Sequence, residues 1–96
     1  MAIAKKFTGS DGEEIILIFC PACKSGHHIR VKNGKRELSV WDWNESLESP
    51  TFIPSLLCYL DKGKICHSYI TDGKIRFLKD CSHNMAGQTV PLEKLQ

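Results

Sequence analysis

The sequence contains no apolar segment long enough to cross a membrane. Its longest apolar run, residues 15–20, has six residues, whereas a membrane-spanning helix needs about 20. Lys5 and Lys6 near the N-terminus are followed by no long apolar stretch, so we expect no secretory signal. Repeats, low-complexity segments and the glycine-rich phosphate loops of flavin and nicotinamide enzymes are also missing. We therefore expect a cytoplasmic protein that contacts no membrane.

The chain also lacks the even cysteine count of a full disulfide framework, because it has five cysteines. In a reducing cytosol, cysteines persist as thiols or as metal ligands. Four of the five lie in clusters that also hold histidine or stand close to one: Cys20-Pro21-Ala22-Cys23, His27-His28, Cys66-His67 and Cys81-Ser82-His83. We therefore expect the chain to fold around a metal ion.

A chain of 96 residues has room for one hydrophobic core. We expect a single domain over residues 1–96, with residues 1–12 and 93–96 as loose termini. So short a chain buries only about two-thirds of its surface on folding, which leaves the apolar core marginal. A structural zinc site, worth roughly 10–16 kcal/mol in small peptides, would supply much of the missing stability.

Neither sign of charge dominates, since the formal net charge is +2. Residues 24–36 carry five basic residues and no acid, and residues 37–48 carry four acids and no base. Such alternation is typical of a solvated surface rather than of a nucleic-acid groove. If the protein were a zinc-ribbon nucleic-acid binder, the basic block would make the contacts: Lys24, Arg30, Lys32, Lys35 and Arg36.

The pattern of apolar residues predicts a mostly β fold with little helix, either a small zinc-stabilised antiparallel sheet or a partly open barrel. Residues 15–19 are apolar on both faces and indicate a central strand. A short strand at 29–32 should lead into a hairpin turn at Asn33-Gly34, and residues 38–43 alternate as a strand. Residues 49–54 contain two prolines and should form an extended edge passage rather than a central strand. A meander should follow, with strands at 56–60, 65–71 and 74–79, and then one helical turn before a short strand at 89–92.

The Asp72-Gly73 turn sets the register of the meander, because a two-residue loop pairs Thr71 with Lys74. This register pairs Ser68 with Phe77 and places Cys66 opposite Lys79, at the open end of the hairpin and close to Cys81. Side chains alternate along a strand, so Cys66 and His67 should point to opposite faces and should not share a metal.

Cys-x-x-Cys at the end of a strand is the geometry of a zinc knuckle. A redox pair has the same spacing, but Pro21 and the following polar turn favour a knuckle over a helix. We expect one closed tetrahedral zinc site made of Cys20, Cys23, Cys66 and Cys81. The spacing leaves His83, His27 and His67 open as alternates or as ligands of a second ion. Cys58 is interpreted as a buried free thiol and His28 as exposed.

The ordered series of motifs resembles a family of small phage and prophage proteins of unassigned function. The motifs, spread over roughly residues 15–92, are Phe19-Cys-Pro-Ala-Cys, His27, Trp41-Asp-Trp-Asn44, Pro50-Thr-Phe-Ile-Pro-Ser-Leu-Leu57, Cys66-His-Ser68, Asp72-Gly73 and Phe77-Leu-Lys-Asp-Cys-Ser-His83. The resemblance implies a zinc-binding protein that works in the cytoplasm of an infected or lysogenic bacterium.

Three functions follow from these observations. The preferred hypothesis is that the zinc is structural and that a surface of the meander, including Tyr69, Lys74 and Arg76, binds and blocks a host protein, such as a defence enzyme. The alternative is a zinc-dependent hydrolytic enzyme, in which His67 or His83 would act as general base and Asp80 would orient it. The third is nucleic-acid binding.

Overall fold

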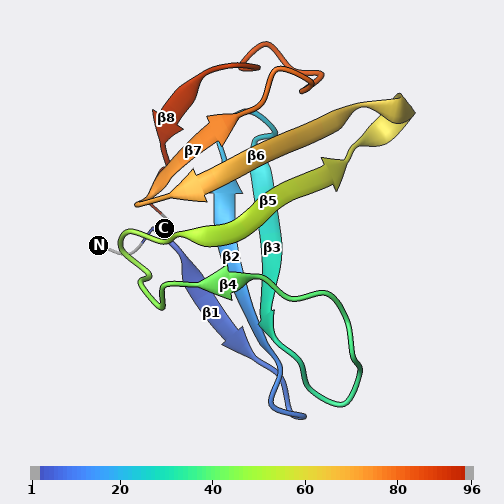
Figure 1. Cartoon of the computed structure of the whole chain (residues 1–96), viewed down its shortest axis with the longest axis vertical. Coiled ribbons are helices and arrows are strands. Elements are labelled where there is room, and N and C mark those ends of the chain that lie inside the picture. The colour runs from blue at the N-terminus through green and yellow to red at the C-terminus, as the bar shows by residue number, and fades with distance from the viewer. Residues whose placement is uncertain (1–2, 95–96) are drawn as a thin grey trace.

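The computed structural model describes residues 3–94 and consists of two antiparallel β-sheets (Figure 1). The first sheet has the strand order β1-β2-β3 and the second has the order β4-β5-β6-β7-β8. The strands are β1 (Lys5–Thr8), β2 (Glu14–Cys20), β3 (Ser25–Lys32), β4 (Asp42–Trp43), β5 (Phe52–Tyr59), β6 (Ile65–Thr71), β7 (Lys74–Phe77) and β8 (Thr89–Pro91), with one 3-10 turn, η1 (Asp61–Gly63), between β5 and β6. The predicted mostly β fold is confirmed.

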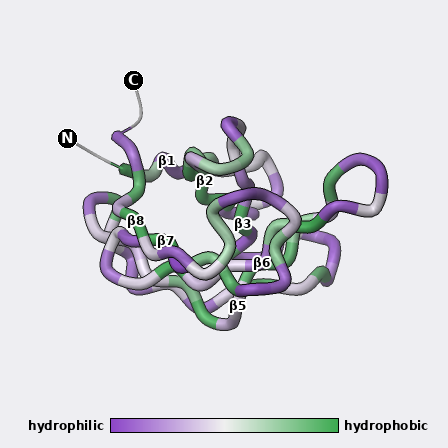
Figure 2. The backbone as a smooth tube through the Cα atoms, turned by 90° about the horizontal axis from the view of Figure 1, so that it is seen from above, coloured by the Kyte–Doolittle hydropathy of each residue, from purple (hydrophilic) through white to green (hydrophobic). Residues whose placement is uncertain are grey.

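The two sheets pack face to face around one core, with the strands of one sheet crossing those of the other (Figure 1). Viewed from above, β1 and β2 lie on one side and β5 to β8 on the other (Figure 2). Alternate residues point inward: Ile16 and Ile18 of β2 and Ile75 of β7 are completely buried. The inner faces therefore hold the apolar side chains, and the outer face of the five-stranded sheet is left to polar and partly exposed ones.

The hairpin of β6 and β7 has the register that the turn predicts. Thr71 pairs with Lys74 and Ser68 with Phe77, and both turn residues, Asp72 and Gly73, have positive φ as an Asp-Gly turn requires. β7 ends at Phe77, earlier than expected, so Cys66 has no strand partner at position 79.

Three expectations about the strands were wrong. Asn33-Gly34 forms no hairpin turn, because the Asn33 side chain bonds both the N–H and the carbonyl of Leu38 and closes a wide loop. After this loop only residues 42–43 form a strand, and that strand belongs to the other sheet. Residues 52–54 lie inside β5, between β4 and β6, where a bulge accommodates Pro54.

The N-terminal region is more ordered than expected, since residues 5–8 pair with β2 and Ala4 is buried. Residues 1–2 and 95–96 of the expected loose termini lie outside the described residues. Among the described residues no helix is both long and apolar enough to cross a membrane.

Replacing a core isoleucine tests how the two sheets are held together. Ile75→Ala should lower the free energy of unfolding by about 2–5 kcal/mol, because the side chain is fully buried between the sheets. Ile53→Ala is the matched control: this side chain is 60% exposed, and its loss should change stability by no more than about 0.5 kcal/mol. Chemical denaturation measures both, and equal losses would contradict the packing described.

Candidate functional site

Two neighbouring residues of β6 carry the two halves of the site on opposite faces of the sheet. Cys66 is buried and points into the core between the sheets, whereas His67 is only partly buried and points outward. This arrangement follows from the alternation of side chains along a strand. Cys66 therefore belongs to an inner cluster of sulfur and imidazole groups, and His67 belongs to an outer polar cluster.

The inner cluster begins at the tight turn that joins β2 and β3. The Lys24 N–H donates to the Cys20 carbonyl at 2.8 Å, and Lys24 itself has a positive φ of 55°. The turn brings the Cys23 N–H to 3.4 Å from the Cys20 sulfur, as expected for a knuckle in which backbone amides stabilise thiolates. Both cysteines consequently face the same point in the core.

His27 on β3 and Cys66 on β6 complete this cluster. One ligand atom from each of Cys20, Cys23, His27 and Cys66 lies within 4.8 Å of all the others, and the group could hold a metal ion. The Nδ1 of His27 is 3.4 Å from the sulfur of Cys58. Its Nε2 is buried and has no hydrogen-bond partner among residues 3–94. A metal-binding histidine has this pattern, with one nitrogen available to the ion and the other held by a neighbouring acceptor.

Charge is shared unevenly within this cluster. A hydrogen bond from the Cys66 thiol stabilises the Cys20 thiolate and lowers the pKa of Cys20 to about 3. The same interaction raises the pKa of Cys66, because Cys66 keeps the proton. Burial, reinforced by the charge of Cys20, raises the pKa of Cys23 to about 11. The adjacent Cys20 sulfur raises the pKa of His27 to about 9. One sulfur therefore ionises readily beside three groups that keep their protons, and a divalent cation would displace those protons.

A second group, made of Cys66, Cys81 and His83, also has its ligand atoms within 4.8 Å of one another. The Nδ1 of His83 accepts the Met85 N–H at 3.2 Å, so its proton lies on Nε2. That Nε2 is 3.4 Å from the Cys66 sulfur. His83 thus donates a hydrogen bond to Cys66.

Cys81 is held against the backbone of His67. Its sulfur accepts the His67 N–H and donates to the His67 carbonyl, both at 3.1 Å. Cys81 therefore contacts the backbone of β6 and also belongs to the second group that could hold a metal ion.

Three residues of the expected set, Cys20, Cys23 and Cys66, come together with His27, one of the expected alternates. The fourth expected ligand, Cys81, lies in the second group with Cys66 and His83. The choice between these ligand sets stays a prediction.

On the outer face of the sheet, Ser55, His67 and Asp80 form a hydrogen-bonded chain. The Ser55 hydroxyl is 3.0 Å from Nε2 of His67, and Nδ1 of the same ring is 3.0 Å from an Asp80 carboxylate oxygen. The His67 side chain is 24% exposed and that of Asp80 is 54% exposed. The outer cluster is therefore open to solvent and accessible to a substrate.

Ser55 lies at the end of a bulge in β5. Phe52 pairs with Ile70 and Leu56 pairs with Ser68, so residues 53–55 of β5 oppose a single residue of β6. Leu57 pairs with His67, and Ser55, two residues earlier in β5, lies on the same outer face as that histidine. The indole N–H of Trp41 donates to the Ser55 carbonyl at 3.1 Å and holds the bulge in place.

The loop after β7 is fastened to β6 and positions Asp80. The Leu78 N–H donates to the His67 carbonyl at 2.9 Å. At the other end of the loop, Ser82 exchanges two hydrogen bonds with Ile65: its hydroxyl accepts the Ile65 N–H and its own N–H donates to the Ile65 carbonyl. Asp80 lies between these two attachments and faces Nδ1 of His67.

A hydroxyl, an imidazole and a carboxylate in this order form the arrangement of the serine hydrolases, which is recognised by geometry and not by chain order. The sequence alone directed attention to His67 and Asp80 but not to Ser55. A lone serine after a proline carries no motif, and only its position in the bulge reveals it. The sequence interpretation also missed Cys58 as the neighbour of His27.

The comparisons with known proteins point to the same chemistry. The model of the BubE family, described as bacterial ubiquitination-like system serine protease, matches residues 2–78, and the chain belongs to this family. The match includes Ser55 and His67 and ends two residues before Asp80. Comparison with curated proteins and with solved structures found no match.

The family corrects the preferred functional hypothesis. A phage-type protein that acts by binding a host protein was expected, and the family is instead one of proteases in a bacterial ubiquitination-like system. The reason for the error is that Ser55 was not recognised, so the sequence appeared to lack an active site. The match says nothing of a phage origin. Nucleic-acid binding stays a prediction, and Arg30 of its basic set is paired with Glu13.

Proposed function

We propose that the protein is a serine protease of a bacterial ubiquitination-like system, with Ser55 as nucleophile, His67 as general base and Asp80 as the residue that orients the histidine. The single observation that carries this proposal is the chain of two 3.0 Å contacts that links the three side chains. The description of the family, which names a serine protease, supports it independently.

The geometry assigns each group one step. Nε2 of His67 removes the hydroxyl proton as the Ser55 oxygen attacks the carbonyl carbon of the scissile bond. The Asp80 carboxylate accepts a hydrogen bond from the Nδ1–H of His67, stays ionised and stabilises the imidazolium that forms. The histidine then gives its proton to the leaving amine, which departs and leaves an acyl ester on Ser55. Water, activated by the same histidine, hydrolyses the ester and restores the serine.

The inner cluster has a structural part in this proposal, as a binding site for Zn²⁺. Three sulfur donors and one imidazole are a common ligand set of closed structural zinc sites. The buried Nε2 of His27, which has no hydrogen-bond partner in the described part of the chain, fits that set. Because Cys66 is a member and His67 is the next residue, the ion would fix the position of the catalytic histidine in β6. No step of the hydrolysis passes through the metal.

Substitution of the nucleophile tests the proposed function most simply. Ser55→Ala should abolish hydrolysis of p-nitrophenyl acetate, and Asp80→Asn should lower kcat by about 10²–10⁴-fold because it removes the charge that stabilises the imidazolium. Ser39→Ala, in the exposed loop before β4, is the matched control and should retain full activity. Retention of activity by Ser55→Ala, with circular dichroism unchanged, would refute the triad.

Elemental analysis tests the inner cluster. The purified protein should contain one zinc per chain, and removal of the ion by a chelator should lower the Tm by about 4–8 °C for each kcal/mol of binding energy lost. His27→Ala should weaken zinc binding, whereas His27→Cys should keep it, because a thiolate can replace the imidazole. His28→Ala, the exposed neighbour, is the control. A Tm that does not respond to the chelator would exclude a structural metal.

Two substitutions of Cys81 distinguish a role in positioning His67 from a role in metal binding. Cys81→Ala removes both contacts to the His67 backbone and should lower kcat by about 10–100-fold, since small displacements of a catalytic group are costly. Cys81→Ser can make both hydrogen bonds and should retain most of the activity. Zinc content should stay at one per chain in both variants, and its loss in Cys81→Ser would identify Cys81 as a ligand.

A further inference from the structure

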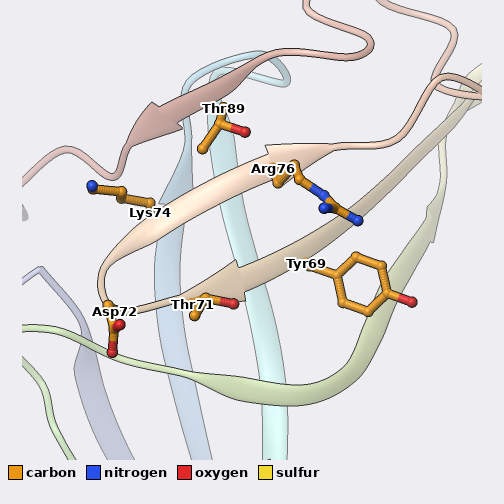
Figure 3. Close-up of a pocket in the computed structure, with 6 residues that line it drawn as sticks. All are labelled: Tyr69, Thr71, Asp72, Lys74, Arg76 and Thr89. Atoms are coloured by element: carbon orange, nitrogen blue, oxygen red, sulfur yellow. The ribbon is translucent and has the colours of Figure 1, made fainter.

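A groove lies on the outer face of the five-stranded sheet, next to the outer cluster. It has a volume of about 480 Å³ and is lined by residues of β6, the β6–β7 turn, β7 and β8: Tyr69, Thr71, Asp72, Lys74, Arg76 and Thr89 (Figure 3). The proposed catalytic reaction uses none of these residues.

The groove and the proposed active site lie on the same face of β6. His67, Tyr69 and Thr71 are alternate residues of β6 and so point to the same outer face. Two residues of a strand span roughly 6–7 Å, which places the Tyr69 ring one side chain beyond the catalytic imidazole. Arg76 is the cross-strand partner of Tyr69 on β7. A polypeptide of a few residues that reaches Ser55 can therefore also occupy the groove.

The groove is cationic and has an aromatic surface. The guanidinium of Arg76 lies 5.3 Å from the centre of the Tyr69 ring, and Figure 3 shows it extending towards that ring. Among residues 3–94, neither Arg76 nor Lys74 forms an ion pair with a carboxylate. Asp72, the one acid of the lining, is at the turn and contacts the Thr51 hydroxyl. With two cations and one acid, the lining of the groove carries a net positive charge.

An arginine whose plane is fixed by an aromatic ring is well suited to bind a carboxylate through two parallel hydrogen bonds. We propose that this groove binds an acidic side chain of the polypeptide substrate, two or three residues away from the bond that Ser55 attacks. The inference rests on the proposed function, because it assigns the groove to the substrate of that site.

Competition with a small ester tests the inference. Hydrolysis of p-nitrophenyl acetate by the full-length, zinc-loaded protein reports on the triad. The competitors are acetylated, C-terminally amidated hexaglutamate and hexaglutamine, which have no terminal charges. At roughly 0.15 M salt, where long-range attraction is screened, hexaglutamate should inhibit with a Ki about tenfold lower than hexaglutamine, consistent with one charge-assisted bidentate contact.

Arg76→Gln should raise the Ki of hexaglutamate about tenfold, the loss of that one contact, and leave the Ki of hexaglutamine unchanged. Arg36→Gln makes the same change of charge in the exposed loop before β4, and it should alter neither constant. Equal inhibition by the two peptides, or equal effects of the two substitutions, would overturn the inference. A preference that requires a free C-terminal carboxylate would also overturn it, because the groove would then bind a chain end.

The two proposals fail in different ways. If Ser55→Ala hydrolyses the ester as fast as the unsubstituted protein, the proposed function is wrong. If the ester is hydrolysed at Ser55 but the acidic peptide has no advantage, only the assignment of the groove is wrong.

Discussion

The alternation of side chains along β6 is the constraint on which the site depends. It directs Cys66 inward to the sulfur cluster and His67 outward to the serine and the aspartate. Two sites with opposite requirements, a buried cluster that could hold a metal and a proposed catalytic histidine that is partly open to solvent, are thus joined by a single peptide bond. Any shift of β6 by one residue would exchange the two faces and destroy both sites.

Several devices keep β6 in that register. Its hairpin with β7 is closed by the Asp72-Gly73 turn. In the loop after β7, the Cys81 thiol makes two hydrogen bonds to the backbone of His67. On the other side, the bulge of β5 is held by Trp41 through the Ser55 carbonyl. The three side chains of the proposed triad come from a bulge, a strand and a loop, and each has its own local support. In a chain with so small a core, such supports replace the extensive packing that surrounds an active site in a larger enzyme.

Local patterns in the sequence predicted what is local in the structure. The Asp-Gly turn predicted the register of β6 and β7, and that register predicted that Cys66 and His67 diverge. The predictions that were wrong or incomplete concerned contacts between residues far apart in the sequence. The amide of Asn33 closes a loop with Leu38 instead of a hairpin, and His27 reaches Cys66 only because the two sheets pack together. Ser55 was missed because its proposed role depends on its contact with His67 on the neighbouring strand, and no short motif predicts that contact.

We propose that the inner cluster, with its metal ion, holds β6 in the position from which His67 activates Ser55. The most direct measurement is to treat the protein with a fluorophosphonate, which reacts with activated serines, and to map the adduct by mass spectrometry before and after chelation of the metal. We expect one adduct per chain, on Ser55, and its loss when the metal is removed. An adduct on another serine, or labelling of Ser55 that persists unchanged in the chelated protein, would contradict this account.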